Sequence, residues 1–338
     1  MARLPWLDAV LAAGAVPASF VPDASGGRSD AADVTGADVM EGSGLAVHEL
    51  RHPPLAPSAV TFVDGIQRWA VVGYDGVVPL ISAYVAAAAR RRTGGRLHTV
   101  AEESRRVIVT AEGSLSPPVR EALRRSREPV VDLKDDVPGQ PGRTLTAAGM
   151  RIERLRESVE RAVAEPLADR LPEDEWLVVD GVLSNSKDLA SHPRTLGLIK
   201  SHGAQYFTGE ELRRALMLPP GHRTSVFQPH RHGSQAVYSW YVRIWPWEGH
   251  DLLYGLLRVE ARADAESIAR ADAIGAWLVN ERKPLSTPDA RFDRLLYPIH
   301  DVETYLRSRA PLHLVTDPGS RLPPAATAAT AATAEPGT

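Results

Sequence analysis

Two Asp-Gly pairs each follow an apolar run that has the composition of a buried strand. Asp64 ends the run VTFVD, and Asp180 ends the run WLVVD. Carboxylates placed where the chain leaves a sheet are held rigidly and can coordinate divalent cations. An Asp before a Gly also commonly belongs to a turn, so either residue alone has two interpretations. We expect Asp64 and Asp180 together to form one acidic site.

A two-metal site for phosphodiester cleavage requires further ligands. Three or four carboxylates or histidines hold two cations roughly 3.5–4 Å apart, so that one activates water and the other stabilises the leaving oxygen. A predicted helix over 144–170 offers Glu153, Glu157 and Glu160. At about 100° per residue, Glu157 lies nearly opposite the apolar stripe, whereas Glu153 and Glu160 lie at its border. A solvent-exposed helical face explains the same residues, so the choice among them stays open.

Two further residues, His300 and Lys200, and two basic runs each have a functional and a structural interpretation. His300 lies in LLYPIHDVETY on an otherwise apolar segment, where it is either a metal ligand or a packing residue. Lys200 follows the strand-like run TLGLI and is either a phosphate contact or an exposed strand end. The basic runs over 89–96 and 120–128 either steer a phosphate backbone or form an ordinary Arg-rich surface.

The elements that must position these residues follow from periodicity and turns. Strand-like runs over 58–74 and 77–91 flank Asp75-Gly76, which predicts a two-residue hairpin. A third strand over 105–113 completes an antiparallel meander. The helix over 144–170 then leads to strands over 176–183 and 195–201. This order predicts an α/β fold with a mixed sheet flanked by helices.

The remaining segments extend this core. Two strands over 234–247 and 252–264 are joined around Glu248-Gly249-His250, and two closing helices follow, the second interrupted by Pro298. We expect an N-terminal helix and flexible linker over 1–44, a folded body over 45–318 and a disordered Ala/Thr/Pro tail over 319–338.

Six segments, taken in order, resemble the NurA nuclease family. They are FVDGIQR, RESVERAVA, LVVDGVLS, LGLIKSHG, LLRVEA and YPIHDVETY. The resemblance implies an RNase H-like core and a NurA-like nuclease domain over 45–318. It implies that Asp64, Glu160, Asp180 and His300 are catalytic metal ligands, with Glu157 and Glu153 as substitutes for Glu160. It also places Lys200, Arg258 and Glu260 at recurring positions, the first two as substrate contacts.

The same resemblance implies an activity and partners. It predicts a nuclease dependent on Mn²⁺ or Mg²⁺, with two ions, that acts on DNA ends in resection, repair or defence. It further implies a homodimer that docks on a HerA-type hexameric ATPase translocase.

Bulk composition limits the alternatives. The 338 residues have a net charge of -3, so any polyanion site must be local. Cysteine is absent, which excludes thiolate ligands and is compatible with the reducing cytoplasm. The sequence contains no run of about 18 apolar residues, the length needed to span a membrane. Two other functions remain: a non-catalytic RNase H-like module that docks a translocase or clamps DNA, and a sugar-kinase-like ATPase, for which a Gly-rich phosphate loop is missing.

Overall fold

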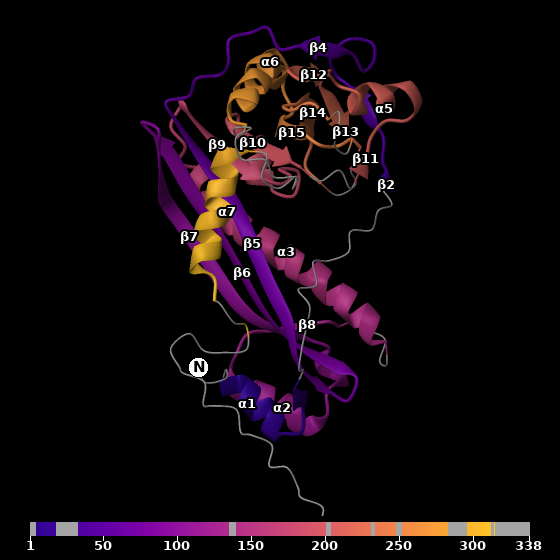
Figure 1. The fold of residues 1–338 in the computed structure, drawn as a ribbon, viewed down its shortest axis with the longest axis vertical. Coiled ribbons are helices and arrows are strands. Elements are labelled where there is room, and N and C mark those ends of the chain that lie inside the picture. Colours follow the sequence, from indigo (N-terminus) through magenta and orange to yellow (C-terminus); the bar gives the residue numbers. More distant parts are fainter. Residues whose placement is uncertain are drawn as a thin grey trace, which may run out of the picture.

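Three long antiparallel strands run the length of the molecule (Figure 1). The computed structural model describes residues 5–17, 33–134, 140–200, 204–230, 234–247, 252–282, 296–311 and 314. The long strands are β5 (Ala59–Asp75), β6 (Val78–Thr93) and β7 (Arg96–Thr110). The predicted hairpin joins β5 to β6, but its two loop residues are Gly76 and Val77, one position later than predicted, because Asp75 still pairs with Val78. Gly76 has a φ of 59°, which a glycine adopts readily.

A helical crossover returns the chain to the other edge of β5. Helix α3 (Pro141–Ala168) leads to β9 (Glu175–Asp180), which pairs parallel to β5, and β10 (Thr195–Ile199) pairs parallel to β9. The resulting strand order is β7-β6-β5-β9-β10. An antiparallel meander followed by a helix and parallel strands on the opposite edge is the RNase H-like arrangement, so the predicted fold class is confirmed.

The sheet continues beyond this core. β15 (Leu256–Arg262) pairs antiparallel to β10, and β14 (Val237–Arg243) pairs antiparallel to β15. The shorter strands are β1 (Val16–Pro17), β2 (Asp33–Val34), β3 (Ala37–Val39), β4 (Val47–Glu49), β8 (Val130–Asp132), β11 (Ala204–Gln205), β12 (His222–Thr224) and β13 (Phe227–Pro229). The other helices are α1 (Pro5–Ala12), α2 (Pro117–Ser126), α4 (Lys187–Ser191), α5 (Gly209–Leu216), α6 (Ala265–Asn280) and α7 (Tyr297–Arg309).

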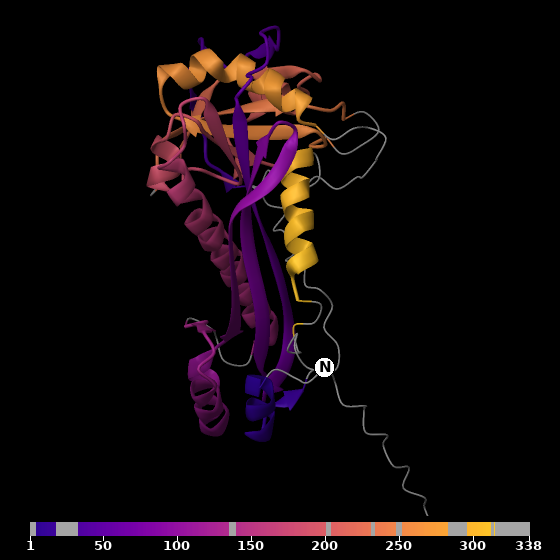
Figure 2. The ribbon, with the colours of Figure 1, turned by 90° about the vertical axis from the view of Figure 1, so that its left-hand side faces the viewer.

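Helices α3 and α7 cover opposite faces of the long strands (Figure 2). Because side chains alternate along a strand, β5 serves both faces. Val63 packs in the hydrophobic cluster that contains the apolar side of α3, whereas Phe62 and Ile66 pack in the cluster that contains α7. At the far end of the long strands, α1 and α2 close a third, smaller cluster.

Two details of the predicted organisation are wrong. Part of the predicted linker belongs to the fold, because β3 pairs with β13 and β2 pairs with β11. Pro298 lies in the first turn of α7, where its missing N–H costs no helical hydrogen bond, so it begins the helix and does not interrupt it. The tail over 319–338 and the junction at 248–250 lie outside the described residues. Of the helices in the described part of the chain, none is long and apolar enough to cross a bilayer.

Candidate active site

The site lies where two strands part. β5 and β9 pair from Ala59 and Glu175 as far as Val63 and Val179, and Asp64 and Asp180 are the next residues on the two strands. β9 ends at Asp180, but β5 continues to Asp75. The prediction that both aspartates mark strand ends is therefore wrong for Asp64. It lies inside a long strand, at the point where that strand loses its neighbour.

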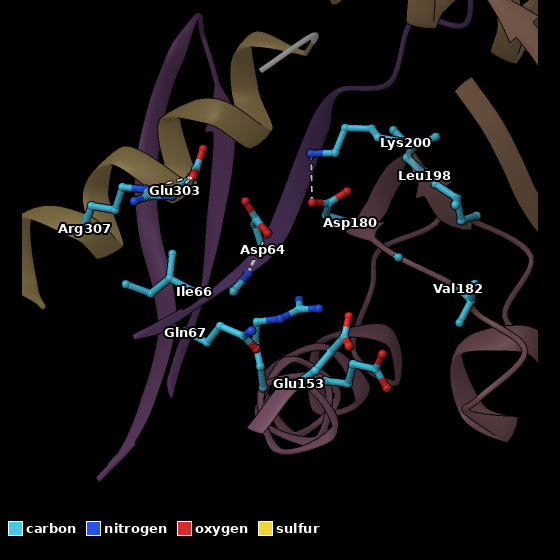
Figure 3. Close-up of a pocket in the computed structure, with 15 residues that line it drawn as sticks. Asp64, Ile66, Gln67, Glu153, Asp180, Val182, Leu198, Lys200, Glu303 and Arg307 are labelled. Atoms are coloured by element: carbon cyan, nitrogen blue, oxygen red, sulfur yellow. Dashed lines mark hydrogen bonds and ion pairs between the residues drawn. The ribbon is translucent and has the colours of Figure 1, made fainter. Parts of the chain in front are cut away.

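A pocket of about 420 Å³ occupies the gap that the parting opens. Residues from β5, α3, the end of β9, β10 and α7 surround it (Figure 3). Its charged or amide-bearing lining residues are Asp64, Gln67, Glu153, Arg156, Glu157, Asp180, Lys200, Glu303 and Arg307. Asp64 and Asp180, more than 100 positions apart in the sequence, thus face one space.

The acids reach the pocket from both faces of the sheet. Asp64 lies on the same face of β5 as Phe62 and Ile66, which pack on the α7 side. Glu160 comes from α3 on the other side, and Gly65 makes room for it. A Cβ on Gly65 would overlap the Glu160 carboxylate and lie 2.8 Å from its Cγ. The glycine of this Asp-Gly pair therefore has a steric role that differs from its role in a turn.

The surroundings of Asp64 oppose its negative charge. Burial raises the pKa of Asp64 well above its usual range, and repulsion from Asp180 and Glu160 raises it further. Lys200 and the N–H of Gly65, which donates to Asp64 Oδ1 at 2.7 Å, act in the opposite direction. The three carboxyl groups therefore interact electrostatically across the gap between β5 and β9.

Glu160 is the buried acid of α3. It is 5% exposed, and burial raises its pKa from an ordinary 4.5 to about 7 against the opposing charge of Arg156, with repulsion from Asp180 adding to the rise. Arg156 forms an ion pair with Glu160 one helical turn away. Glu160 does not line the pocket of about 420 Å³ but an adjoining smaller hollow that it shares with Asp180, whereas Glu153 and Glu157 line the larger pocket and are more exposed. The helical angle placed Glu157 nearly opposite the apolar stripe, and it could not show that the pocket extends along this flank of α3.

A lysine holds the second aspartate. Lys200 Nζ lies 2.9 Å from Asp180 Oδ2, and the two side chains are 10% and 20% exposed. Lys200 lies just beyond β10, whose Leu198 pairs with Asp180 on β9. Lys200 therefore lines the pocket as the sequence predicted for a phosphate contact, although a neighbouring carboxylate already binds its ammonium group.

Helix α7 contributes a glutamate that the sequence did not single out. Glu303 lines the pocket and its Oε1 accepts from Arg307 Nε at 2.8 Å and Nη2 at 2.6 Å. His300, the predicted ligand on this helix, is not among the pocket residues. Its Nδ1 lies 3.6 Å from Glu303 Oε2 and is buried without a hydrogen-bond partner. The spacing of three residues in HDVE would have put Glu303 on the same helical face as His300.

Arg258 does not lie in the pocket. It is 3% exposed on β15, and its Nη1 donates to Glu260 Oε1 at 2.6 Å. The predicted substrate contact is therefore buried behind the site, where it cannot reach a substrate. Alternation along a strand explains this: residues two apart share a face, so the Arg and Glu of LLRVEA meet each other.

The basic run over 89–96 is also committed to structure. Arg90 pairs with Asp301 at 3.1 Å, and Arg91 and Arg92 pair with Glu175 and Glu281. In the run over 120–128, Arg124 pairs with Glu112, and this run lies on α2 at the far end of the long strands. Neither run forms the positive surface beside the pocket that the sequence allowed.

The donor chemistry at the pocket fits hard divalent cations. Carboxylate oxygens are the ligands that Mg²⁺ and Mn²⁺ prefer, and Asp64, Glu160 and Asp180 repel one another in a way that a cation would relieve. Within the described residues, no three acidic or histidine side chains are gathered closely enough to hold an ion as they stand. Arg156 and Lys200 pair with two of these acids, so metal binding would require them to exchange partners.

Comparison with known proteins gives distant structural neighbours. No protein-family model matches the chain, and neither does any curated protein sequence. The structure is similar to the crystal structure of the NurA nuclease from Sulfolobus solfataricus, with 11% identity, 77% of this chain and 81% of that chain covered, and a TM-score of 0.41. It is also similar to human ENDOV, with 14% identity, coverage of 77% and 87%, and a TM-score of 0.28. It is similar as well to the catalytic domain of human Endonuclease V, with 16% identity, 77% of this chain and 85% of that chain covered, and a TM-score of 0.29.

Proposed function

We propose that this protein is a metal-dependent DNA nuclease that hydrolyses phosphodiester bonds at the pocket between β5 and β9. One observation carries the proposal: Asp64 and Asp180 meet where the two strands part, with Glu160 close enough that the three carboxyl groups repel one another. Mutually repelling acids in an open pocket lower the stability of the folded protein, and a bound cation would supply the compensating charge.

Asp64, Glu160 and Asp180 would hold the metal ions, with His300 as the predicted fourth ligand and Glu303 as the α7 carboxylate nearest to the pocket. Two Mn²⁺ or Mg²⁺ ions would supply Lewis acidity to the phosphate and lower the pKa of water. At neutral pH the raised pKa values of Asp64 and Glu160 mean that protons and cations compete for these oxygens.

The chain's own cations would orient the phosphate. Lys200 and Arg307 line the pocket from the Asp180 side and the α7 side, so each could donate to a phosphate that enters it. Arg156 reaches the pocket from α3. A cation bound to the carboxylates would free Lys200 and Arg156 from their ion pairs to donate to the phosphate oxygens. We therefore propose that both residues bind the substrate.

The outer face of α3 offers a track for the DNA backbone. Arg143, Arg154 and Arg161 are 11 and 7 positions apart along α3, which puts them within about 20° of one line and about 16 Å and 10 Å apart along the axis. Arg161 lines a hollow beside Asp180, and Arg154 lines another of about 410 Å³. A row of cations that leads to an acidic pocket matches a strand of phosphates that ends at a cleavage site.

The biological setting follows from the motif resemblance. We propose that the nuclease acts on DNA ends in resection, repair or defence, in the cytoplasm, as a homodimer with a HerA-type hexameric ATPase. Co-purification of the chain with such an ATPase, and a mass of two chains in solution, are the measurements that test these partners.

A non-catalytic module that docks a translocase or clamps DNA is the second candidate. The observation that favours it is that Lys200 and Arg156 already provide positive charge to Asp180 and Glu160. In that case the pocket would be satisfied without metal, and the chain would bind DNA without cutting it.

The deciding experiment measures Mn²⁺- and Mg²⁺-dependent degradation of linear DNA by the wild type, Asp64→Asn and Asp180→Asn. Asp75→Asn is the matched control, because Asp75 belongs to the third Asp-Gly pair but ends β5 at the hairpin and does not line the pocket. We expect both pocket variants to lose activity and the control to keep it. Activity that survives in both would refute the site, and an inactive wild type that still binds DNA, even with the ATPase present, would favour the docking module.

A further inference from the structure

Glu260 is a fully buried carboxylate that does not line the pocket. It lies on β15 with 0% exposure, and its two oxygens have different partners. Oε1 accepts from Arg258, which also donates to Ser239 Oγ at 3.2 Å. Oε2 accepts from the backbone N–H groups of Leu183 at 2.8 Å and Ser184 at 3.3 Å. One carboxylate thus ties β15 to the segment that follows β9.

A glycine on the strand between them permits this contact. Gly197 of β10 is directly paired with Glu260, so the two residues share one face of the sheet. A Cβ on Gly197 would lie 2.6 Å from the carbonyl oxygen of Gly181 and 3.0 Å from Leu183 Cγ. The backbone after Asp180 therefore rests directly on β10, within reach of the Glu260 side chain.

Residues 181–186 connect the end of β9 to α4 and are held by hydrogen bonds at both ends. The N–H of Gly181 donates to Leu198 O at 3.0 Å, and Ser186 at the other end caps α4 and donates through its hydroxyl to Glu165 of α3 at 2.7 Å. Asp180 immediately precedes this segment. Any shift of the segment would move the Asp180 backbone and the carboxylate that Lys200 binds.

We propose that Glu260 is a positioning residue for the nuclease site: by holding the N–H groups of residues 183 and 184, it fixes the backbone that aims Asp180 into the pocket. This role rests on the proposed function. Hydrogen bonds to a charged acceptor are stronger than neutral ones, and Arg258 supplies the counter-charge that lets Glu260 remain charged inside the sheet. An apolar residue could fill the same space but would leave two buried N–H groups without an acceptor.

The test replaces Glu260 with glutamine. A carboxylate has acceptors on both sides, whereas an amide has one acceptor and one donor, so Glu260→Gln must lose either the Arg258 contact or the two backbone contacts. Glu41→Gln is the matched control. Glu41 also accepts from a buried arginine, Arg223, at 2.6 Å and from a backbone N–H, that of Val226, at 3.0 Å, but it lies away from the pocket.

Three readouts are compared between the two variants: hydrogen exchange at the amides of 183 and 184, the Mn²⁺ concentration that half-saturates binding, and kcat on linear DNA. For Glu260→Gln we expect hydrogen exchange at the amides of 183 and 184 to be about tenfold faster. We also expect Mn²⁺ affinity and kcat to fall by about 10- to 100-fold, as they do when a residue that orients a metal ligand without touching the metal is removed. For Glu41→Gln we expect a lower melting temperature with all three readouts unchanged. Gly197→Ala, which leaves Glu260 in place but pushes on the segment, should reproduce the loss of Mn²⁺ affinity if Glu260→Gln fails to fold.

The outcomes separate this proposal from the proposed function. Wild-type exchange and wild-type Mn²⁺ affinity in folded Glu260→Gln overturn the positioning role even if the protein is an active nuclease. If the wild type cuts no DNA but binds Mn²⁺ more tightly than Glu260→Gln, the nuclease proposal fails and the positioning role stands. If the wild type binds no Mn²⁺, the positioning role is overturned, because faster exchange at 183 and 184 alone shows only that Glu260 holds these two N–H groups.

Discussion

The pH dependence of stability offers a direct test of the strain at Glu160. The unfolded chain titrates this group near 4.5, whereas the folded protein holds the proton to about pH 7 because the side chain is buried beside Asp180. Between these values the unfolded state has lost the proton and the folded state has kept it, so rising pH favours unfolding. The stability that protonated Glu160 provides is complete below about pH 4.5 and is lost as the pH rises to about 7.

The size of the effect follows from the shift. A pKa raised from 4.5 to about 7 corresponds to about 3 kcal/mol of unfolding free energy. Glu160→Gln keeps the shape of the protonated acid and cannot ionise. We therefore expect this variant to match the wild type near pH 4.5 and to be more stable by about 3 kcal/mol at pH 8, a large part of the stability of an ordinary domain.

The measurement is urea unfolding from pH 4.5 to 8 in the presence of a chelator. Glu153→Gln is the control, because Glu153 lies on the same helix and lines the adjoining larger pocket but is exposed and does not contribute to the raised pKa of Glu160. We expect it to follow the wild-type curve. The reasoning is refuted if Glu160→Gln shows the wild-type dependence on pH, or if it is the less stable protein at pH 8.

Other consequences of the site can be checked separately. Gly65→Ala should displace the α3 glutamate and cost about 1–3 kcal/mol of stability, measured by urea unfolding, whereas Gly142→Ala, with no atom near the added methyl group, should not destabilise the fold. Nuclease activity at limiting Mn²⁺ should rise from pH 6 to 8, because the α3 glutamate must lose its proton near pH 7 to bind the ion, and a flat profile would contradict this. The double variant Arg154→Ala and Arg161→Ala should weaken DNA binding and lower its salt dependence by about two phosphate contacts in a salt titration. Glu303→Gln should reduce Mn²⁺ affinity if this carboxylate contributes to the site, and unchanged affinity would exclude it.

The sequence was most informative where strand pattern and chemistry coincide. Asp64 and Asp180 each follow an apolar run, and parallel pairing of those runs brings the two residues to one place. The choice of helix glutamate was open because helical angle alone cannot show that Gly65 leaves a space on the sheet for Glu160. That space depends on a contact between residues almost 100 positions apart, which no local pattern contains.

The misplaced residues have physical reasons of the same kind. His300 attracts attention because imidazole often binds metals, but it is Glu303, three residues further along α7, that lines the pocket. Arg258 was expected at the substrate, yet alternation along β15 pairs it with Glu260 inside the sheet. The arginines of 90–92 are a dense positive run in the sequence, and each one is neutralised by a carboxylate from a distant element.

The pairing of β5 with β9 also sets the order in which the molecule can assemble. The β5–β6 hairpin closes through neighbours such as Asp75 and Val78, so it is a local event. By contrast, Ser58 and Asp174, which meet at the start of the parallel ladder, are 116 residues apart. Closing so long a loop is slow, because its entropy is lost before the ladder gains any contact. The meander should therefore form first, and the acids should meet only after α3 has delivered β9 to the free edge of β5.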